Sequence, residues 1–357
     1  MLDKSKTWMI YGANGYTGRL IAGRAAAEGW KPVLAGRDAA KIAAIAKELD
    51  CPFRVFSLSS VQAAAKHLDG LSVVLHCAGP FSRTAEPMMR ACLAAGVNYL
   101  DITGEVDVIE FAARQHDAAV TAGISIMPAV GFDVVPSDCL AAQLAAALPS
   151  AVELELAFKA GSSISPGTAV SMFAWSGKGG RVRKDGQIIR VPSAWKDKRI
   201  RFPSGERQAM TIPWGDVSSA FHTTGIPNIE VYVVAPTRQI RSLRRWRWLL
   251  PMTNLAPIQW LGRRWIKRNV QGPDDSSRAK GSAEFWGRVT DSAGRVAEAT
   301  LVTPEGYSLT VQTAVEIMRR TLAGEVAPGF STPAKAFGGK FIEQFDGVQI
   351  AWRTVPS

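Results

Sequence analysis

The chain has 357 residues, of which 47% are hydrophobic and 20% are charged, a balance typical of a globular protein and not of a disordered one. Its length favours two domains over one, and no run of about 20 apolar residues is present to span a bilayer. The formal net charge of +11 indicates an anionic partner: nucleic acid, acidic lipid headgroups, an acidic carrier protein or the phosphates of a cofactor.

The cysteines and the N-terminus indicate a reducing compartment. Cys51, Cys77, Cys92 and Cys139 form no C-x-x-C pair, and no His stands at metal-ligand spacing from them, so no metal site is expected. The short polar N-terminus does not resemble a signal peptide. We therefore expect a cytoplasmic protein, with peripheral contact at the inner face of the membrane as an addition to that location.

A glycine-rich turn follows the first apolar segment, which is expected to form a strand at residues 8–11. A helical pattern begins directly after the turn and continues to Ala27. A helix N-terminus that follows such a turn binds pyrophosphate through its free N–H groups and its dipole. The residues expected to bind the dinucleotide here are Gly12, Ala13, Asn14, Gly15, Tyr16, Thr17 and Gly18.

A second strand ends about 20 residues after the turn, at the position that selects between NAD and NADP. Gly36 and Arg37 stand there, and a permanently charged guanidinium suits a 2′-phosphate. Asp38 is expected to cap the helix that begins at Ala39. The sequence therefore favours NADP over NAD.

Strands and helices then alternate up to residue 128, which predicts a doubly wound parallel sheet with right-handed crossovers. Ligands bind beyond the carboxyl ends of the strands in such sheets. The fourth strand runs into Cys77, Ala78, Gly79 and Pro80, which we expect along the ribose and nicotinamide side of the cofactor. The next helix is predicted over 86–95.

Groups that can ionise or donate a proton follow the fifth and sixth strands. Asp101, Thr103, Glu105 and Asp133 are the candidate catalytic residues, because a carboxyl group in a partly apolar cleft can hold a proton near neutral pH. Asp101 and Asp133 are equally suited to holding loop amides. The Tyr-x-x-x-Lys pair of short-chain dehydrogenases is absent.

Five motifs together resemble the saccharopine dehydrogenase-like oxidoreductases, most closely the trans-acting enoyl reductase branch. They are 12–18, 35–37, 77–81, 99–105 and 131–138. The resemblance covers the first 140 residues strongly and the remainder in outline. It implies an NADP-binding Rossmann domain, a second α+β domain that contributes to the substrate site, and a homodimer formed through the second sheet.

The second domain is expected to be built on a mostly antiparallel sheet. Residues 152–158 and 228–234 read as strands, and 282–291 with 295–303 as a hairpin. We place the Rossmann domain at 1–135 and the substrate and dimerisation domain at 136–324. By the resemblance, the tail at 325–357 packs back on the first domain, with Thr332 capping a helix.

An insertion at about 238–270 interleaves arginines with tryptophans, and its basic part runs from Arg241 to Arg268. This pattern suits helices in a membrane interface, where tryptophans lie at headgroup level and arginines meet phosphates. Contact with an acyl-carrier protein, a lid over an apolar substrate and an exposed helical hairpin are the alternatives. No nucleic-acid-binding motif accompanies the charge, so nucleic acid is not an expected partner.

These features predict an NADP-dependent oxidoreductase that reduces a C=C (enoyl) or C=N bond of an apolar small molecule or carrier-bound acyl substrate. A saccharopine-type amino-acid dehydrogenase is the alternative enzyme, although no matching arginine set for a dicarboxylated substrate stands out. The alternative outside catalysis is an NADP-binding sensor that docks on membranes or partners.

Overall fold

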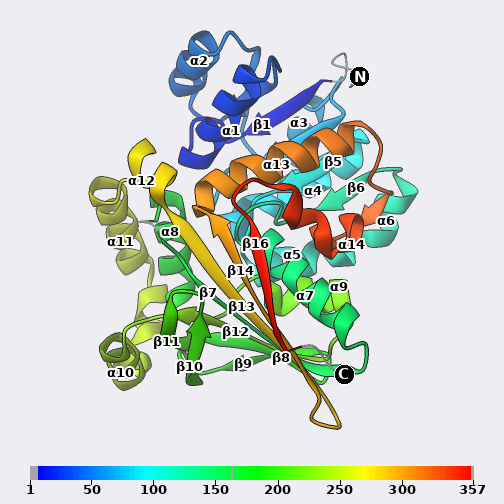
Figure 1. Ribbon diagram of the computed structural model, residues 1–357. Coiled ribbons are helices and arrows are strands. Elements are labelled where there is room, and N and C mark those ends of the chain that lie inside the picture. The colour runs from blue at the N-terminus through cyan, green and yellow to red at the C-terminus, as the bar shows by residue number, and fades with distance from the viewer. Residues whose placement is uncertain (1–6, 162–163, 355–357) are drawn as a thin grey trace. The chain divides into compact units, whose positions relative to one another are not determined.

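The computed structural model describes residues 7–161 and 164–354, which form two compact units. The first unit contains residues 7–133 and 309–336, and the second contains the described parts of 134–308 and 337–357. Each unit has its own sheet (Figure 1). The predicted fold class, a parallel Rossmann sheet followed by an α+β unit, is confirmed.

The first unit is built on a seven-stranded sheet in the order β15-β6-β5-β4-β1-β2-β3, in which every pair is parallel. Its strands are β1 (Trp8–Tyr11), β2 (Val33–Gly36), β3 (Phe53–Val55), β4 (Val73–His76), β5 (Asn98–Asp101), β6 (Ser125–Met127) and β15 (Gly329–Phe330). The strands β1, β2 and β4 are buried along their whole length, as apolar runs in a doubly wound sheet must be.

The helices of the first unit connect its strands, and some of them begin at a side-chain cap. They are α1 (Tyr16–Ala27), α2 (Ala39–Glu48), α3 (Val61–Lys66), α4 (Phe81–Ala95), α5 (Val106–Arg114), α6 (His116–Thr121), α13 (Gly306–Leu322), which enters this unit at Leu309, and α14 (Pro333–Phe337), of which 333–336 belong here. Asp38 accepts from the Lys41 amide and Ser60 from the Ala63 amide, each as an N-cap. The predicted capping role of Asp38 is thereby confirmed.

The second unit contains a nine-stranded sheet in which only β7 and β12 pair in parallel. Its main path runs β10-β11-β12-β7-β13-β14-β16, and β8 pairs with β12 and β9. The strands are β7 (Ala151–Lys159), β8 (Gly180–Lys184), β9 (Gln187–Val191), β10 (Asp197–Phe202), β11 (Gly205–Thr211), β12 (Asn228–Val234), β13 (Ser282–Asp291), β14 (Val296–Pro304) and β16 (Gln349–Thr354).

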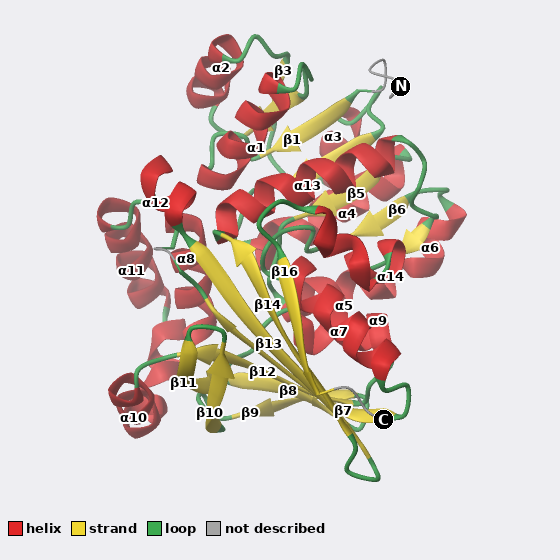
Figure 2. Ribbon diagram, viewed as in Figure 1, coloured by secondary structure: helices red, strands yellow, loops and turns green. Residues whose placement is uncertain are grey.

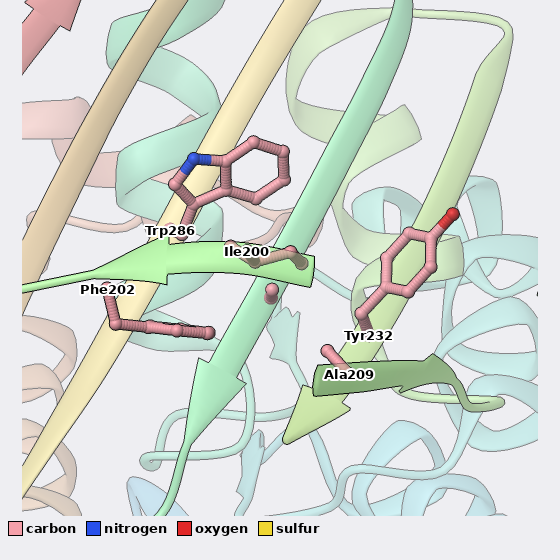
Figure 3. Packing of buried hydrophobic residues seen from close by; sticks show 6 residues of the cluster. Ile200, Phe202, Ala209, Tyr232 and Trp286 are labelled. Carbon is pink, nitrogen blue, oxygen red and sulfur yellow. The ribbon is translucent and has the colours of Figure 1, made fainter. Parts of the chain in front are cut away.

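One face of this sheet holds an aromatic core cluster. Figure 3 shows Ile200 and Phe202 of β10 beside Trp286 of β13, together with Tyr232 of β12 and Ala209 of β11. Ala157 of β7 completes the cluster, and all six residues are buried. Burial of their apolar surface, at roughly 25 cal/mol per Å², holds the β10–β11 hairpin on the sheet.

The helices of the second unit lie around its sheet, as Figure 2 shows in red. They are α7 (Val135–Ala147), α8 (Pro166–Ser176), α9 (Asp216–Thr224), α10 (Thr237–Trp246), the 3₁₀ segment η1 (Arg247–Asn254), α11 (Ala256–Asn269), α12 (Asp275–Lys280) and the 3₁₀ segment η2 (Gly339–Gln344). Among the residues that the structure describes, no helix has both the length and the apolar composition that crossing a bilayer requires.

Two predicted boundaries are corrected by the structure. The tail at 325–357 does not pack on the first unit as a whole: β15 pairs with β6 there, whereas β16 pairs with β14 in the second sheet. Conversely, most of α13, which we placed in the second domain, belongs to the first unit. Strand pairing and the buried face of α13 decide both assignments, and neither is expressed in local sequence.

Candidate functional site

Four strand ends of the first unit lie next to one another. The register pairs Ala35 with Tyr11, Tyr11 with His76 and His76 with Asp101. Each of these residues stands at or next to the start of a predicted motif loop. The parallel register therefore brings the glycine turn, the Arg37 loop, the 77–80 loop and the segment after Asp101 to one edge of the sheet.

The glycine turn lies close to both of its neighbours. The amides of Gly12 and Ala13 donate to the Ala35 carbonyl oxygen over 2.7 and 3.2 Å, which ties the turn to β2. Gly12 has φ +88°, and a Cβ atom built on it would lie 2.8 Å from the Ala78 amide nitrogen. Only glycine combines this backbone conformation with this close approach.

The start of α1 packs equally tightly on the turn. The Gly15 amide donates to the Gly12 carbonyl over 2.9 Å, and a Cβ atom on Gly18 would overlap the same carbonyl oxygen. Gly15 is the N-cap residue and offers no side chain to the first turn of the helix. The helix N-terminus is thus built to face an anion without a competing side-chain cap.

Arg37 follows β2 and is exposed. In the described part of the chain its guanidinium forms no ion pair and no hydrogen bond, whereas neighbouring Asp38 binds Lys41. A Cβ atom on Gly36 would lie 3.1 Å from the Asn14 Oδ1 atom, so this glycine allows the two loops to approach. The arrangement leaves one free fork-shaped cation beside the turn.

A buried network holds the 77–80 loop, and two of its members are absent from the sequence-based site. The Thr84 hydroxyl donates to the Ala78 carbonyl over 2.6 Å, and His76 Nε2 lies 3.0 Å from Thr84 Oγ1. Because Thr84 donates to Ala78, we assign the proton of His76 to Nε2. Burial lowers the pKa of His76 to about 3, so the ring is neutral at physiological pH.

Asp101 uses both carboxylate oxygens to hold neighbouring segments. Its Oδ1 accepts from the Thr103 and Ala129 amides over 3.0 and 2.8 Å, and its Oδ2 accepts from the Tyr99 hydroxyl over 2.7 Å. The residue is fully buried. Burial raises its pKa to about 6, although these three donors act in the opposite direction.

Thr103 and Glu105 also position backbone. Thr103 Oγ1 accepts from the Glu105 amide over 3.0 Å, and the Glu105 carboxylate accepts from the Phe81 and Ser82 amides over 2.9 Å each. Glu105 therefore caps α4 from another element. This cap is the physical reason that α4 begins at Phe81 and not at the predicted Glu86.

Asp133 lies beside the same loop but has a different environment. A Cβ atom on Gly104 would lie 2.7 Å from Asp133 Oδ2, so the carboxyl group packs directly against that glycine. Burial, followed by the neighbouring Glu105 charge, raises the pKa of Asp133 to about 7. The pKa of Asp133 therefore lies nearer neutrality than that of Asp101.

The loop that ends at Asp133 is held by α13, which sequence reasoning did not connect to the site. The Phe132 amide donates to Thr310 Oγ1 over 3.0 Å, and the Thr313 hydroxyl donates to the Val130 carbonyl over 2.8 Å. These partners are about 180 residues apart in the chain, so no local signal identifies them.

The sequence profile of the saccharopine dehydrogenase NADP-binding domain matches residues 8–127. That range contains the four strand ends and the four segments that follow them. The first part of the chain therefore matches this NADP-binding domain, as the motifs predicted, and the match supports NADP as the cofactor. The parallel sheet and the loops at its edge are those of an NADP-binding domain of saccharopine dehydrogenase type.

Curated relatives match the same part of the chain. Two Mycobacterium tuberculosis proteins named as trans-acting enoyl reductases are 33% and 32% identical over 141 and 144 residues, which is 36% and 38% of this chain and 33% and 34% of theirs. A human saccharopine dehydrogenase-like oxidoreductase is 29% identical over 150 residues, which is 36% of this chain and 35% of that protein. The chain thus covers about a third of the length of the curated relatives it matches.

A solved structure extends the likeness in fold. The apo saccharopine dehydrogenase (L-Glu forming) of Saccharomyces cerevisiae matches 98% of this chain and 100% of its own with a TM-score of 0.66 at 12% identity. At that identity the match shows a shared fold. It includes the second unit, which the domain profile does not reach.

Proposed function

We propose that this protein is an NADP-dependent reductase that acts on a C=C (enoyl) or C=N bond of an apolar or carrier-bound substrate. The observation that supports this most is the convergence of glycine-lined loops and a carboxyl group titrating near pH 7 at one sheet edge. Dinucleotide binding and proton supply at one place are what such a reduction requires.

The residues at the strand ends fit the chemistry of NADP. The turn at 12–18 and the uncapped start of α1 would hold the pyrophosphate, and Arg37 would hold the 2′-phosphate through its planar fork. The loop at 77–80 would border the ribose and nicotinamide. The bound cofactor supplies the hydride.

We assign the carboxyl candidates different tasks. Below about pH 7 the Asp133 carboxyl group carries a proton. We assign it the task of donating that proton to the substrate during hydride transfer. Asp101, Thr103 and Glu105 act as positioning residues, because their oxygens already accept from loop and helix amides.

The proposed substrate class rests on the names of the relatives. Proteins that share the first part of the chain are named as enoyl reductases, which favours a conjugated C=C bond. The saccharopine-type alternative predicts a dicarboxylated amino acid instead. A protein that binds NADPH tightly but oxidises it with neither substrate class is the sensor alternative.

Cofactor binding is tested by fluorescence titration with NADPH and NADH. We expect NADPH to bind at least about tenfold more tightly, a difference of roughly 1.4 kcal/mol, and Arg37→Ala to abolish this preference. Arg37→Lys keeps the charge without the fork and is expected to retain part of it. Equal binding of both nucleotides by the unmodified chain would contradict the assignment of Arg37.

Proton supply is tested by the pH dependence of NADPH oxidation with enoyl thioesters and with cyclic imines. A donor with a raised pKa is protonated below that value, so activity is present below about pH 7 and falls as pH rises through it. Asp133→Asn is expected to abolish this pH dependence and to lower the rate at least about 100-fold. The exposed Asp69→Asn is the matched control, and a profile unchanged by Asp133→Asn would overturn the role.

A further inference from the structure

Large apolar side chains are exposed on one part of the second unit. Seven of the twelve that are exposed in the described residues lie within 246–265. Trp248, Trp260 and Trp265 are 67%, 60% and 63% exposed, whereas Trp8 in the first sheet is 1% exposed. Single exposed apolar residues need no explanation, but a concentration of this kind marks an interaction surface.

These side chains project from helices that are firmly packed on their other side. Ile266 of α11 packs with Ala169, Val170 and Phe173 of α8. A Cβ atom on Gly262 would overlap the Phe173 ring, so the two helices are in close contact. The exposure therefore belongs to the outward side of an anchored helix and not to a loose segment.

The outward side of α11 is amphipathic in an unusual way. Residues three or four positions apart are neighbours on a helix surface, and the exposed residues of α11 combine bulky apolar groups with guanidinium groups. We call this exposed surface the Trp–Arg face, and its members are Trp260, Leu261, Arg264, Trp265 and Arg268, all of them exposed. The Arg264 guanidinium lies 5.6 Å from the centre of the Trp260 ring.

The elements that precede α11 extend this chemistry. In α10, Arg238, Arg241 and Arg245 form an exposed row while Ile240 is buried with Ala194 and Ala235. Hydrogen bonds from Asn254 Nδ2 to the Gly177 carbonyl and between Ser176 and Thr253 hold η1 on the end of α8. Figure 1 shows α10 and α11 on the same side of the second sheet.

The positive charge of this region favours one kind of binding partner over the others. Residues 237–269 contain nine Arg or Lys residues, and no Asp or Glu occurs between 231 and 273. In a two-fold dimer the same patch of both subunits forms the interface. A second copy of the chain would therefore bring two positively charged surfaces together, which is unfavourable. An anionic lipid surface instead supplies phosphates for the arginines and an interface for the tryptophans.

We propose that the Trp–Arg face, with Trp246 and Trp248, docks this protein in the plane of an anionic membrane. The α11 helix, with 14 residues, is about 21 Å long, which is too short to span a hydrocarbon core of about 30 Å. It lies in the interface with its tryptophans at headgroup depth. The proposal is independent of the reaction assigned above, because it uses none of the residues of the first unit.

Vesicle co-sedimentation of the full chain tests this proposal. We expect binding to phosphatidylcholine vesicles that contain phosphatidylglycerol, little binding to pure phosphatidylcholine, and weakening by salt. The double variants Trp260→Ser/Trp265→Ser and Arg264→Glu/Arg268→Glu should each bind at least about tenfold more weakly. Both should retain the wild-type melting temperature and NADPH affinity.

Matched controls lie elsewhere on the same unit. Trp352→Ser changes a tryptophan of β16 that is 41% exposed, and Arg199→Glu reverses an exposed charge of β10. Both should bind vesicles as the unmodified chain does. Equal binding to neutral and anionic vesicles, or unchanged binding of the face variants, would overturn the proposal.

Two further measurements test whether the Trp–Arg face binds a protein instead of a membrane. A dimer in sedimentation velocity that the face variants dissociate would assign the face to a second copy. Saturable binding of an acidic acyl-carrier protein that the vesicles do not displace would assign it to a protein. Either result would overturn the membrane assignment while leaving the NADPH measurements unaffected.

Discussion

The glycine turn after β1 and the outward side of α11 differ in the size of their side chains, and both are unusual for a protein surface. At the turn, side chains are missing at positions where backbone must approach backbone: Gly12 faces Ala78, and Gly18 faces the Gly12 carbonyl. On α11, large apolar side chains remain mostly exposed to solvent, as at Trp260 and Trp265.

This difference separates two kinds of functional signal. The turn is a requirement of local backbone geometry, and a substitution there changes folding and cofactor binding together. The Trp–Arg face contributes little to the folded unit, because its side chains are solvated on the outside of a helix anchored by its other face. Substitutions at the turn should therefore change stability, and substitutions on the Trp–Arg face should not.

The largest loss of stability is expected for Asp101→Ala, next to the cofactor loops. It would leave the Thr103 and Ala129 amides and the Tyr99 hydroxyl without their acceptor in a fully buried place. We expect the free energy of unfolding to fall by about 3–5 kcal/mol in urea titrations, and by less for Asp101→Asn, which keeps one acceptor oxygen. A loss below that of the exposed control Asp69→Ala would refute the positioning role.

The close approach within the turn is tested by Gly18→Ala against Gly23→Ala, two substitutions in the same helix. A Cβ atom on Gly18 overlaps the Gly12 carbonyl, whereas one on Gly23 meets no atom within 4 Å. We expect Gly18→Ala to cost about 2–3 kcal/mol of stability and at least about tenfold in NADPH affinity. Gly23→Ala should stabilise the protein by up to about 1 kcal/mol, and equal effects would remove the basis of the comparison.

A smaller effect is expected when the cap of α4 is removed. Glu105→Ala leaves the Phe81 and Ser82 amides without their carboxylate, at a cost of about 1–2 kcal/mol in thermal or chemical unfolding. Because the same residue holds the end of the 77–80 loop, the KM for NADPH should rise as well. Glu105→Gln keeps one acceptor oxygen, so its stability should lie between those of the unmodified protein and Glu105→Ala. If Glu105→Ala left the stability unchanged, the capping role would be contradicted.

The smallest effect on folding is expected on the Trp–Arg face. Trp265→Ser should change the free energy of unfolding by no more than about 0.5 kcal/mol, because the side chain is already exposed. Gly262→Ala, where the same helix contacts α8, should cost about 1 kcal/mol or more by displacing Phe173. Destabilisation by Trp265→Ser that equals or exceeds that of Gly262→Ala would show that this tryptophan is structural.

The sequence was sufficient wherever a property depends on neighbours along the chain. The strand, turn and helix at 8–27, the capping role of Asp38 and the parallel order of the first sheet follow from apolar periodicity, glycine spacing and alternation of elements. The antiparallel hairpin at 282–304 was visible for the same reason. The NADP-binding family was visible because its motifs are short and contiguous.

Only the tertiary structure decided what depends on distant partners. It divided the predicted candidates by environment, since three donors converge on Asp101 while burial beside Glu105 raises the pKa of Asp133. It added Thr84, Thr310 and Thr313, which hold the loops from other elements. It also placed β16 in the second sheet and showed which side of α11 is covered, because strand pairing and helix burial are set by contacts between segments far apart in the chain.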